Sequence, residues 1–204
     1  MRIIDISQEL FSCAVFPGDE PPVRKVLGTI ENGNICNLTA FSMCAHNGTH
    51  VDAPYHFLQN GKTIDQIDLS AFVGKCYVAR YEGDITEDRA VSIMKAARAA
   101  DPESAKRILI GGDVTVTIDA AKVFSKAGIL LLGNESQTVG PIEAPAEVHY
   151  ELLGSEVVLL EGIRLNGVEE GIYFLNAAPI NLGKSDGAPC RAVLIENISE
   201  EDCK

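Results

Sequence analysis

Residues 46–56 read His-Asn-Gly-Thr-His-Val-Asp-Ala-Pro-Tyr-His and hold three of the four histidines in the chain, with a carboxylate at Asp52. Imidazole nitrogens and carboxylate oxygens are the donors that suit zinc, manganese or iron(II). The fourth histidine, His149, and a carboxylate at Glu161 follow much later in the sequence. The composition of this stretch therefore predicts a metal site, and we expect the distant donors to meet there.

The motif cannot run as a straight strand. At about 3.3 Å per residue, His46 and His56 would stand roughly 33 Å apart, whereas metal–ligand bonds are only about 2 Å long. A continuous helix fits no better, because Gly48 is a poor helix former and Pro54 lacks an N–H. The chain has to bend, and we expect His46 to fold back at Gly48, which tolerates backbone angles that other residues avoid.

Glu161 provides a second signal. It follows four apolar residues, 157–160, so its carboxylate emerges where an expected buried strand leaves the core. A buried acid has to be paired, protonated or bound to a metal, whereas an acid at a strand end can also simply reach water. The residues alone leave both interpretations open.

Length and charge limit the class of protein. A chain of 204 residues most economically forms one domain, residues 1–204, around one core. The net charge of −12, from 17 basic and 29 acidic residues, argues against a nucleic acid or an anionic membrane surface as partner. No apolar run approaches the roughly 20 residues that span a bilayer. We expect a small-molecule partner, with no nucleic acid and no membrane.

The cysteines and the N-terminal residues bear on location. None of the six cysteines forms a Cys-x-x-Cys pair, which favours a reducing compartment. Residues 1–6 carry charges within an apolar patch and lack a small-residue cleavage site, so we expect no signal peptide. Both features predict a cytoplasmic protein.

Hydrophobic patterning predicts an α/β protein. Strands are expected at residues 2–6, 23–30, 35–44, 76–81, 107–111, 129–132, 157–160, 172–175 and 190–195. One helix is expected to begin after an N-cap at Thr86, and two more are expected at residues 118–127 and 147–153. The first of these helices has an apolar stripe at Ala90, Val91, Met94, Ala97 and Ala100. Residues 107–132 predict a parallel crossover, and Asn32-Gly33 predicts a hairpin turn.

The pattern His46-x-Gly48-Thr49-His50-x-Asp52-x-Pro54-x-His56 resembles the signature of the metal-dependent cyclase/hydrolase family that includes the bacterial kynurenine formamidases. Three weaker segments are similar to other parts of that family: Phe-Pro-Gly-Asp at 16–19, the run from His149 to Glu161-Gly162, and Asp-Gly-Ala-Pro-Cys-Arg-Ala-Val-Leu at 186–194. The resemblance implies a single domain with a mixed, barrel-like sheet and flanking helices, of the swivelling β/β/α type.

The resemblance also implies roles for individual residues. Five metal ligands are implied, with His56 as a candidate sixth: His46, His50, Asp52, His149 and Glu161. This number exceeds the three protein ligands usual at one catalytic zinc and suits two ions about 3.5–4 Å apart. The first three would hold one ion and the last two the other, with Asp52 bridging and Glu161 as a second candidate bridge. Zinc is the first expectation and manganese the second.

The remaining implied roles concern catalysis and assembly. His56 would stay free as the general acid/base, with a pKa naturally suited to neutral pH. Phe16 would form an aromatic wall for the substrate; the alternative is that residues 16–22 are a plain connection. The resemblance further implies a homo-oligomer, a dimer or tetramer, in which a neighbouring subunit completes the pocket rim.

The expected chemistry is hydrolysis of an amide by metal-activated water. N-formylkynurenine or another aryl formamide is the first candidate substrate, and a cyclic amide the second. The chain departs from its relatives by having no tryptophan and by placing Gly111-Gly112-Asp113 where they commonly have Arg-Thr. Two other classes stay open: a metal-dependent cyclase or lyase acting on a small carboxylic acid, and a non-catalytic metal-binding protein.

Overall fold

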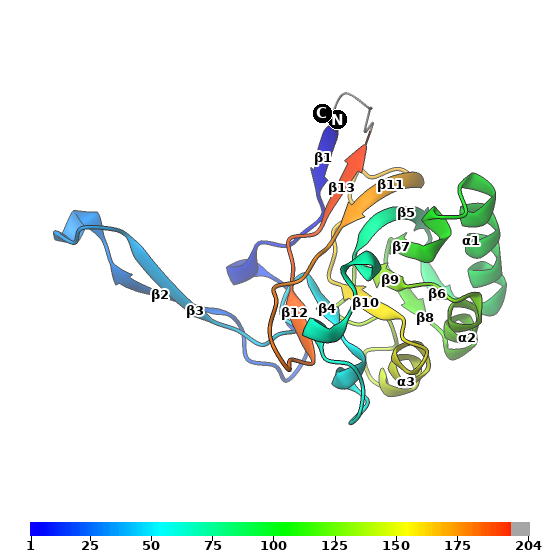
Figure 1. The fold of residues 1–204 in the computed structure, drawn as a ribbon, viewed down its shortest axis with the longest axis horizontal. Coiled ribbons are helices and arrows are strands. Elements are labelled where there is room, and N and C mark those ends of the chain that lie inside the picture. The colour runs from blue at the N-terminus through cyan, green and yellow to red at the C-terminus, as the bar shows by residue number, and fades with distance from the viewer. Residues whose placement is uncertain (197–204) are drawn as a thin grey trace.

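The computed structural model describes residues 1–196 and shows a mixed nine-stranded sheet curled into a half-barrel, in the order β1-β13-β11-β5-β7-β9-β10-β4-β12 (Figure 1). Its strands are β1 (Arg2–Asp5), β4 (His50–Asp52), β5 (Val73–Arg80), β7 (Arg107–Gly111), β9 (Leu131–Asn134), β10 (Val158–Glu161), β11 (Gly171–Asn176), β12 (Gly187–Pro189) and β13 (Val193–Glu196). Two small sheets pair β2 (Val23–Gly28) with β3 (Leu38–Ser42) and β6 (Gly83–Ile85) with β8 (Val114–Val116). The expected single α/β domain with a barrel-like mixed sheet is confirmed.

Parallel strands form the middle of the large sheet. β5, β7, β9 and β10 run parallel, and antiparallel strands flank them on both sides. Helices α1 (Glu87–Ala100), α2 (Ile118–Ala127) and α3 (Ala146–Gly154) link these strands and cover one face of the sheet (Figure 1). Strands covered on both faces can be apolar throughout, and every residue of β7 is buried. The predicted parallel crossover from β7 to β9 is confirmed.

The two longer helices begin as predicted. Thr86 caps α1, since its side chain accepts the N–H of Arg89. The buried face of α1 differs from the predicted stripe: Ile93 is buried, while Val91 is half exposed and Ala100 is exposed. Positions 90, 93, 94 and 97 follow the i, i+3, i+4, i+7 rule. Val91 and Ala100 fall outside that arc, so their prediction was wrong.

Several strand boundaries differ from prediction near the site. The apolar run at 157–160 forms β10 one residue later, so Glu161 is the last strand residue and lies buried. The expected strand at 190–195 is replaced by β12 and β13 on either side of residues 190–192. β4 was not predicted as a strand, because three residues carry too little pattern. It pairs with β10 on one side and β12 on the other.

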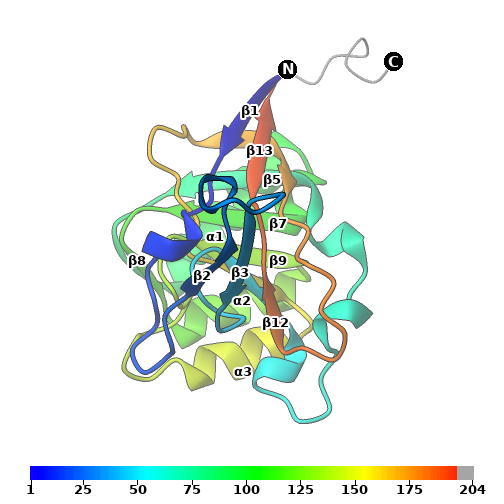
Figure 2. The same cartoon turned by 90° about the vertical axis from the view of Figure 1, so that its left-hand side faces the viewer.

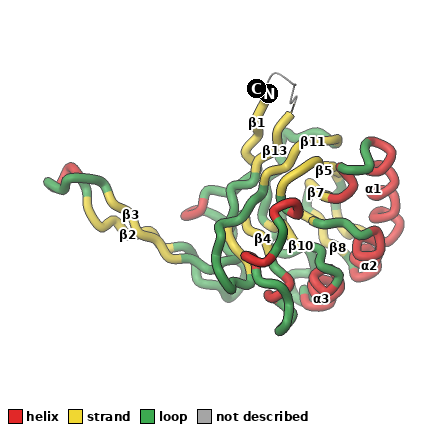
Figure 3. The backbone as a smooth tube through the Cα atoms, in the orientation of Figure 1, coloured by secondary structure: helices red, strands yellow, loops and turns green. Residues whose placement is uncertain are grey.

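The hairpin of β2 and β3 projects from the body as an arm (Figures 1 and 3). The predicted pairing of these strands is confirmed, with Gly33 left-handed at φ 83° in the turn. Both strands are shorter than expected. Seven large apolar residues of the arm are exposed: Val23, Val26, Leu27, Ile30, Ile35, Leu38 and Phe41. Viewed along the arm, the hairpin stands in front of the curled sheet (Figure 2).

Within residues 1–196, no helix combines the length and hydrophobicity needed to cross a membrane. Five cysteines in this part of the chain are free thiols. The sixth, Cys203, lies outside the described residues.

Gly162, at the end of β10, packs closely against the histidine motif of residues 46–56. Gly162 has φ 68°, and its carbonyl accepts hydrogen bonds from Thr49 Oγ1 (2.8 Å) and Gln8 Nε2 (2.8 Å). A Cβ at this position would overlap the Gly48 carbonyl and the side-chain amide of Gln137. Gly162 is therefore required both for its backbone angle and for space.

We predict that Gly162→Ala destabilises the protein more than Gly167→Ala. Gly167 also has a left-handed φ of 74°, but nothing lies within 4 Å of its Cβ position. The control therefore carries only the backbone cost, about 1–3 kcal/mol, and the test variant adds steric overlap. Thermal unfolding of both variants measures the difference. Equal losses of stability would show that the close packing beneath the motif is unimportant.

Candidate metal centre

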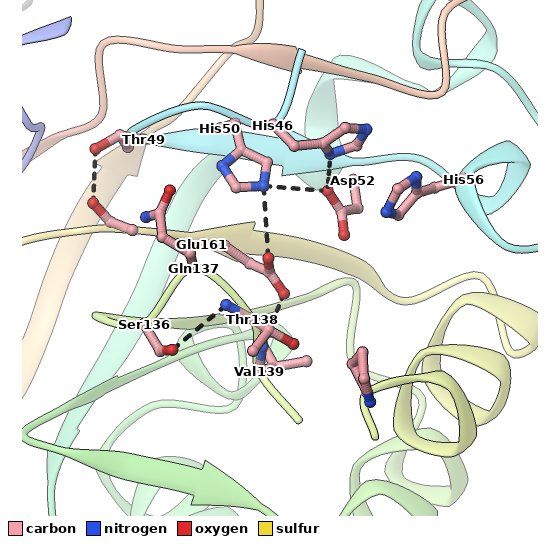
Figure 4. Close-up of polar contacts among 12 residues, drawn as sticks. His46, Thr49, His50, Asp52, His56, Ser136, Gln137, Thr138, Val139 and Glu161 are labelled. Carbon is pink, nitrogen blue, oxygen red and sulfur yellow. Dashed lines mark hydrogen bonds and ion pairs between the residues drawn. The ribbon is translucent and has the colours of Figure 1, made fainter. Parts of the chain in front are cut away.

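The histidine motif bends at Gly48, as the sequence predicted. Gly48 has φ 67°, and the fold-back brings His46 Nδ1 to 2.8 Å from Asp52 Oδ1. His50 and Asp52 lie on β4, and the motif ends in the short 3₁₀ helix η3 (Pro54–His56). The bend therefore places His46, His50 and Asp52 together, as Figure 4 shows.

Asp52 lies at the centre of a cluster that joins three distant segments of the chain. Its Oδ1 is 3.4 Å from His50 Nε2, and its Oδ2 is 3.6 Å from His149 Nε2. Glu161 faces the same two rings, with Oε2 3.4 Å from His50 Nε2 and Oε1 3.4 Å from His149 Nε2. Apart from His46, whose side chain is 15% exposed, these residues are at least 97% buried. The structure thus brings all five predicted ligands together, while their role as ligands stays a prediction.

Backbone carbonyls fix the orientation of the two most buried rings. His50 Nδ1 donates to the carbonyl of Gly48 (3.0 Å), and His149 Nδ1 donates to the carbonyl of Pro145 (2.8 Å). Each ring thereby turns Nε2 toward the two carboxylates. Histidines that bind metals generally donate their other ring N–H in this way.

The protonation of the cluster follows from its charges. Burial opposes a charge on His50 and His149, but hydrogen bonds to Asp52 and Glu161 outweigh it and raise the pKa of each imidazole to about 10. For His46, burial likewise opposes a charge, and its carboxylate partners raise the pKa to about 9. The histidines in turn hold the pKa of Asp52 well below its ordinary value, and that of Glu161 below its own, against the effect of burial. The two carboxylates are thus ionised and require cationic neighbours.

The donor set fits a divalent cation. Among residues 1–196, three groups of donors lie close enough to hold an ion, and two of them share Asp52: one adds His46 and His50, the other His149 and Glu161. Two donors bound tetrahedrally at about 2.0–2.1 Å from one ion are roughly 3.3–3.4 Å apart. Three of the four histidine–carboxylate pairs at His50 and His149 are separated by 3.4 Å and the fourth by 3.6 Å. These separations suit donors that share an ion, whereas the 2.8 Å between His46 Nδ1 and Asp52 Oδ1 is a hydrogen-bond distance.

His56 lies beside this cluster, outside the contacts of the two carboxylates. Its ring stacks on that of His46, with centroids 3.9 Å apart and planes at 26°. Its Nδ1 is 3.3 Å from Asp186 Oδ2, the same oxygen that lies 2.8 Å from His46 Nε2. Asp186 was not among the predicted site residues, although the Asp-Gly at the start of segment 186–194 was a signal that could have identified it.

A cavity of about 260 Å³ opens over the cluster. Phe16, Phe57 and Pro145 provide its apolar walls, while contact of Phe16 with a substrate stays a prediction. Gln137 and Thr138 provide a polar side. Gln137 Oε1 and Thr138 Oγ1 are buried and have no hydrogen-bond partner among residues 1–196. Neither residue was predicted from the sequence, because both lie in a turn-rich segment without a motif.

Comparison with known sequences identifies close relatives. A family model described as "Putative cyclase" matches residues 4–140. Kynurenine formamidase from Bacillus cytotoxicus is 30% identical over 205 residues, which cover 94% of this chain and 96% of that protein. Kynurenine formamidase from Salinibacter ruber is 32% identical over 210 residues, covering 95% and 97%. The chain is therefore similar to these enzymes along nearly its whole length.

Solved structures show the same fold. A potential metal-dependent hydrolase with cyclase activity superposes with a TM-score of 0.80 at 25% identity, covering 97% of this chain and 99% of that one. Isatin hydrolase A from Labrenzia aggregata also gives 0.80, at 20% identity, covering 96% and 94%. At that lower identity, the second likeness concerns the fold alone.

We predict that, with chelator present, the stability of the protein falls as pH rises from about 7 to 10. The folded pKa values of His46, His50 and His149, about 9 to 10, exceed the unfolded value of about 6.5. Their contribution is fully present below pH 6.5 and is lost as pH rises through the folded values. A saturating divalent metal replaces these protons, so its stabilising effect grows over the same range.

Calorimetric melting temperatures with EDTA and with Zn²⁺ or Mn²⁺, measured at several pH values, test this prediction. His149→Gln removes one of the three groups and should reduce the slope with EDTA. A flat profile in EDTA between pH 7 and 10 would contradict the proposed charge balance.

Proposed function

Because this chain belongs to the cyclase family, we propose that it is a metal-dependent hydrolase that cleaves an amide bond in a small molecule. One observation carries the proposal. Asp52 presents its two oxygens to different histidines, beside a second buried carboxylate, and these histidines and that carboxylate, Glu161, line a cavity. This arrangement suits bound cations and leaves room for a substrate above them.

We propose two ions per subunit that share Asp52, zinc first and manganese second. His46 and His50 would complete one set of ligands, and His149 and Glu161 the other. When bound, such ions lower the pKa of a water molecule toward about 7 and polarise the carbonyl of the substrate. Glu161 is also held by the backbone N–H of Val139 (2.8 Å), which fixes one of its oxygens toward His149.

His56 is proposed as the general acid/base. Its ring lines the cavity and is not among the contacts of Asp52 or Glu161. It would accept a proton from the attacking water and return it to the leaving nitrogen. An imidazole that lines the cavity without contacting either buried carboxylate favours catalysis over the alternative of a non-catalytic metal-binding protein.

The other cavity residues are proposed to hold the substrate. Phe16 and Phe57 would pack against a planar group, and the hydroxyl of Thr138, buried without a partner among residues 1–196, would bond to the substrate's polar edge. An aryl formamide of the N-formylkynurenine type suits this combination, and relatives about 30% identical carry the name kynurenine formamidase. A cyclic amide is the second candidate substrate.

The arm supports a proposal of assembly as a dimer or tetramer. An isolated two-stranded hairpin is marginal in water, and contiguous exposed apolar side chains commonly mark interaction sites. The arm exposes apolar residues along both β2 and β3, so we propose that it packs on a neighbouring subunit. We also propose a cytoplasmic location, on the cysteine pattern described above.

We predict that the purified protein contains divalent metal and hydrolyses an aryl formamide or a cyclic amide in a substrate screen. His56→Ala should keep its metal and lose about 10²–10⁴-fold in kcat, the usual contribution of general acid–base catalysis. Tyr55→Ala is the control, because Tyr55 is the neighbouring residue and is exposed outside the cavity lining. Unchanged turnover in His56→Ala would reject the role of His56.

Asp52→Asn tests metal binding by itself, because its readout is metal content and not turnover. The amide keeps one oxygen where the carboxylate had two, so the variant should lose at least one equivalent of metal. Metal analysis by mass spectrometry provides the measurement. Full occupancy in Asp52→Asn would show that Asp52 does not bridge two ions.

The assembly proposal predicts a smaller particle when the arm is made polar. Val26→Asp combined with Leu38→Asp places charges on both strands of the arm, and light scattering should then show a lower mass. Leu69→Asp is the control, because Leu69 is at least as exposed as the two arm residues but lies on the body of the protein. An unchanged mass in the arm variant would rule out the arm as the interface.

A further inference from the structure

Asp186 contacts two of the site histidines with a single oxygen. Its Oδ2 lies 2.8 Å from His46 Nε2 and 3.3 Å from His56 Nδ1. Among residues 1–196, it is the polar partner that the structure gives to the His56 ring. Asp186 does not line the cavity, so it acts on any substrate only through these two rings.

The backbone holds Asp186 firmly in this position. Its carbonyl accepts the N–H of Ala53 (2.9 Å), and the next residue, Gly187, pairs with Asp52 in the sheet. A Cβ on Gly187 would come within 2.7 Å of the His46 ring. The absence of a side chain at Gly187 therefore lets this segment approach the histidines closely.

The three side chains can be read as a cation site or as a hydrogen-bonded group, since their donor atoms lie close enough for either. The stacking of the rings decides between them. An imidazole lone pair lies in the plane of its ring. The planes of the His46 and His56 rings are only 26° apart and their centroids 3.9 Å apart, so lone pairs on both rings cannot point at one ion about 2 Å away. One carboxylate oxygen about 3 Å away can accept both N–H groups. The geometry is that of two imidazoles donating to Asp186.

Donation to Asp186 determines which nitrogen of each ring remains free. His46 gives its Nε2–H to Asp186, so Nδ1, which lies 2.8 Å from Asp52 Oδ1, is the nitrogen left to donate to Asp52 or, once deprotonated, to bind the proposed ion. His56 gives its Nδ1–H to the same oxygen, so Nε2 is the nitrogen left to accept a proton. A histidine acting as a base commonly depends on a carboxylate that holds its tautomer in this way.

We propose that Asp186 is a positioning residue that sets the tautomers of a metal ligand, His46, and of the general acid/base, His56, through one carboxylate oxygen. This inference rests on the proposed function. It links metal affinity to proton transfer, because one side chain orients a residue in each process. Loss of the carboxylate affects both, although it touches neither the cavity nor the two buried acids.

The test compares Asp186→Ala with the wild-type protein loaded with Zn²⁺. Partners that orient metal-binding histidines typically contribute 10–100-fold, so kcat should fall by about that factor with little change in KM. Zinc affinity, measured by competition with a chelator, should fall by a similar factor. Asp186→Asn, whose amide oxygen can still accept one N–H, should recover part of both losses.

Two controls separate positioning from general damage. Asp65 Oδ1 accepts the N–H of Lys184 (2.9 Å) and so anchors the same segment without touching a histidine. Asp65→Ala should leave kcat and zinc affinity within about twofold of wild type. In the His56→Ala background, Asp186→Ala should add little further loss of kcat at saturating zinc, since its effect on kcat passes through His56.

Nitrogen NMR of the ring atoms gives a readout independent of activity, and a chain with four histidines gives simple spectra. His56 should carry its proton on Nδ1 in the wild type and move toward the Nε2–H form in Asp186→Ala. An unchanged tautomer, or unchanged kcat and zinc affinity in an active enzyme, would overturn the proposal. A wild-type protein with the expected tautomers but no hydrolysis across the substrate screen would instead refute the proposed function.

Discussion

Two carboxylates buried side by side need positive charge between them, and this requirement governs the site. Asp52 and Glu161 are each almost wholly inaccessible to solvent and face the same two imidazoles. An ionised carboxylate buried without a partner costs several kcal/mol. The fold can therefore hold this pair only when the space between them is cationic, through protonated histidines or a bound metal. Protonated histidines and a bound metal are therefore two ways of supplying the positive charge that the same pair of carboxylates requires.

The sheet meets this condition through the register of a three-residue strand. β4 lies between β10 and β12, with His50 opposite Glu161 and Asp52 opposite Gly187. A slip of one residue would turn every side chain to the other face and separate the donors. Helix α3 adds His149 from outside the sheet, with its ring fixed by the carbonyl of Pro145. The glycine at 187 and the left-handed glycines at 48 and 162 allow these segments to pack this closely.

Local rules predicted some elements well. Capping, burial and the conformational freedom of glycine act within a few residues of each position. They account for the ends of α2 and β7, the N-cap at Thr86 and the bend at Gly48. β4 and β12 escaped prediction because such short strands are defined by their partners, which lie far away in sequence. The contact of Asp186 with two histidines was missed for the same reason. Three of the predicted ligands share one local motif, whereas bringing His149 and Glu161 to them requires the complete sheet.

The position of β4 within the sheet has a consequence for how the protein is made. The histidine motif leaves the ribosome more than 100 residues before β10 and β12, the strands on either side of β4 in the sheet. Until those strands emerge, the motif has neither Glu161 nor His149 beside it. Binding of the proposed ions therefore has to follow the synthesis of β10, and until then the nascent chain carries an incomplete set of donors.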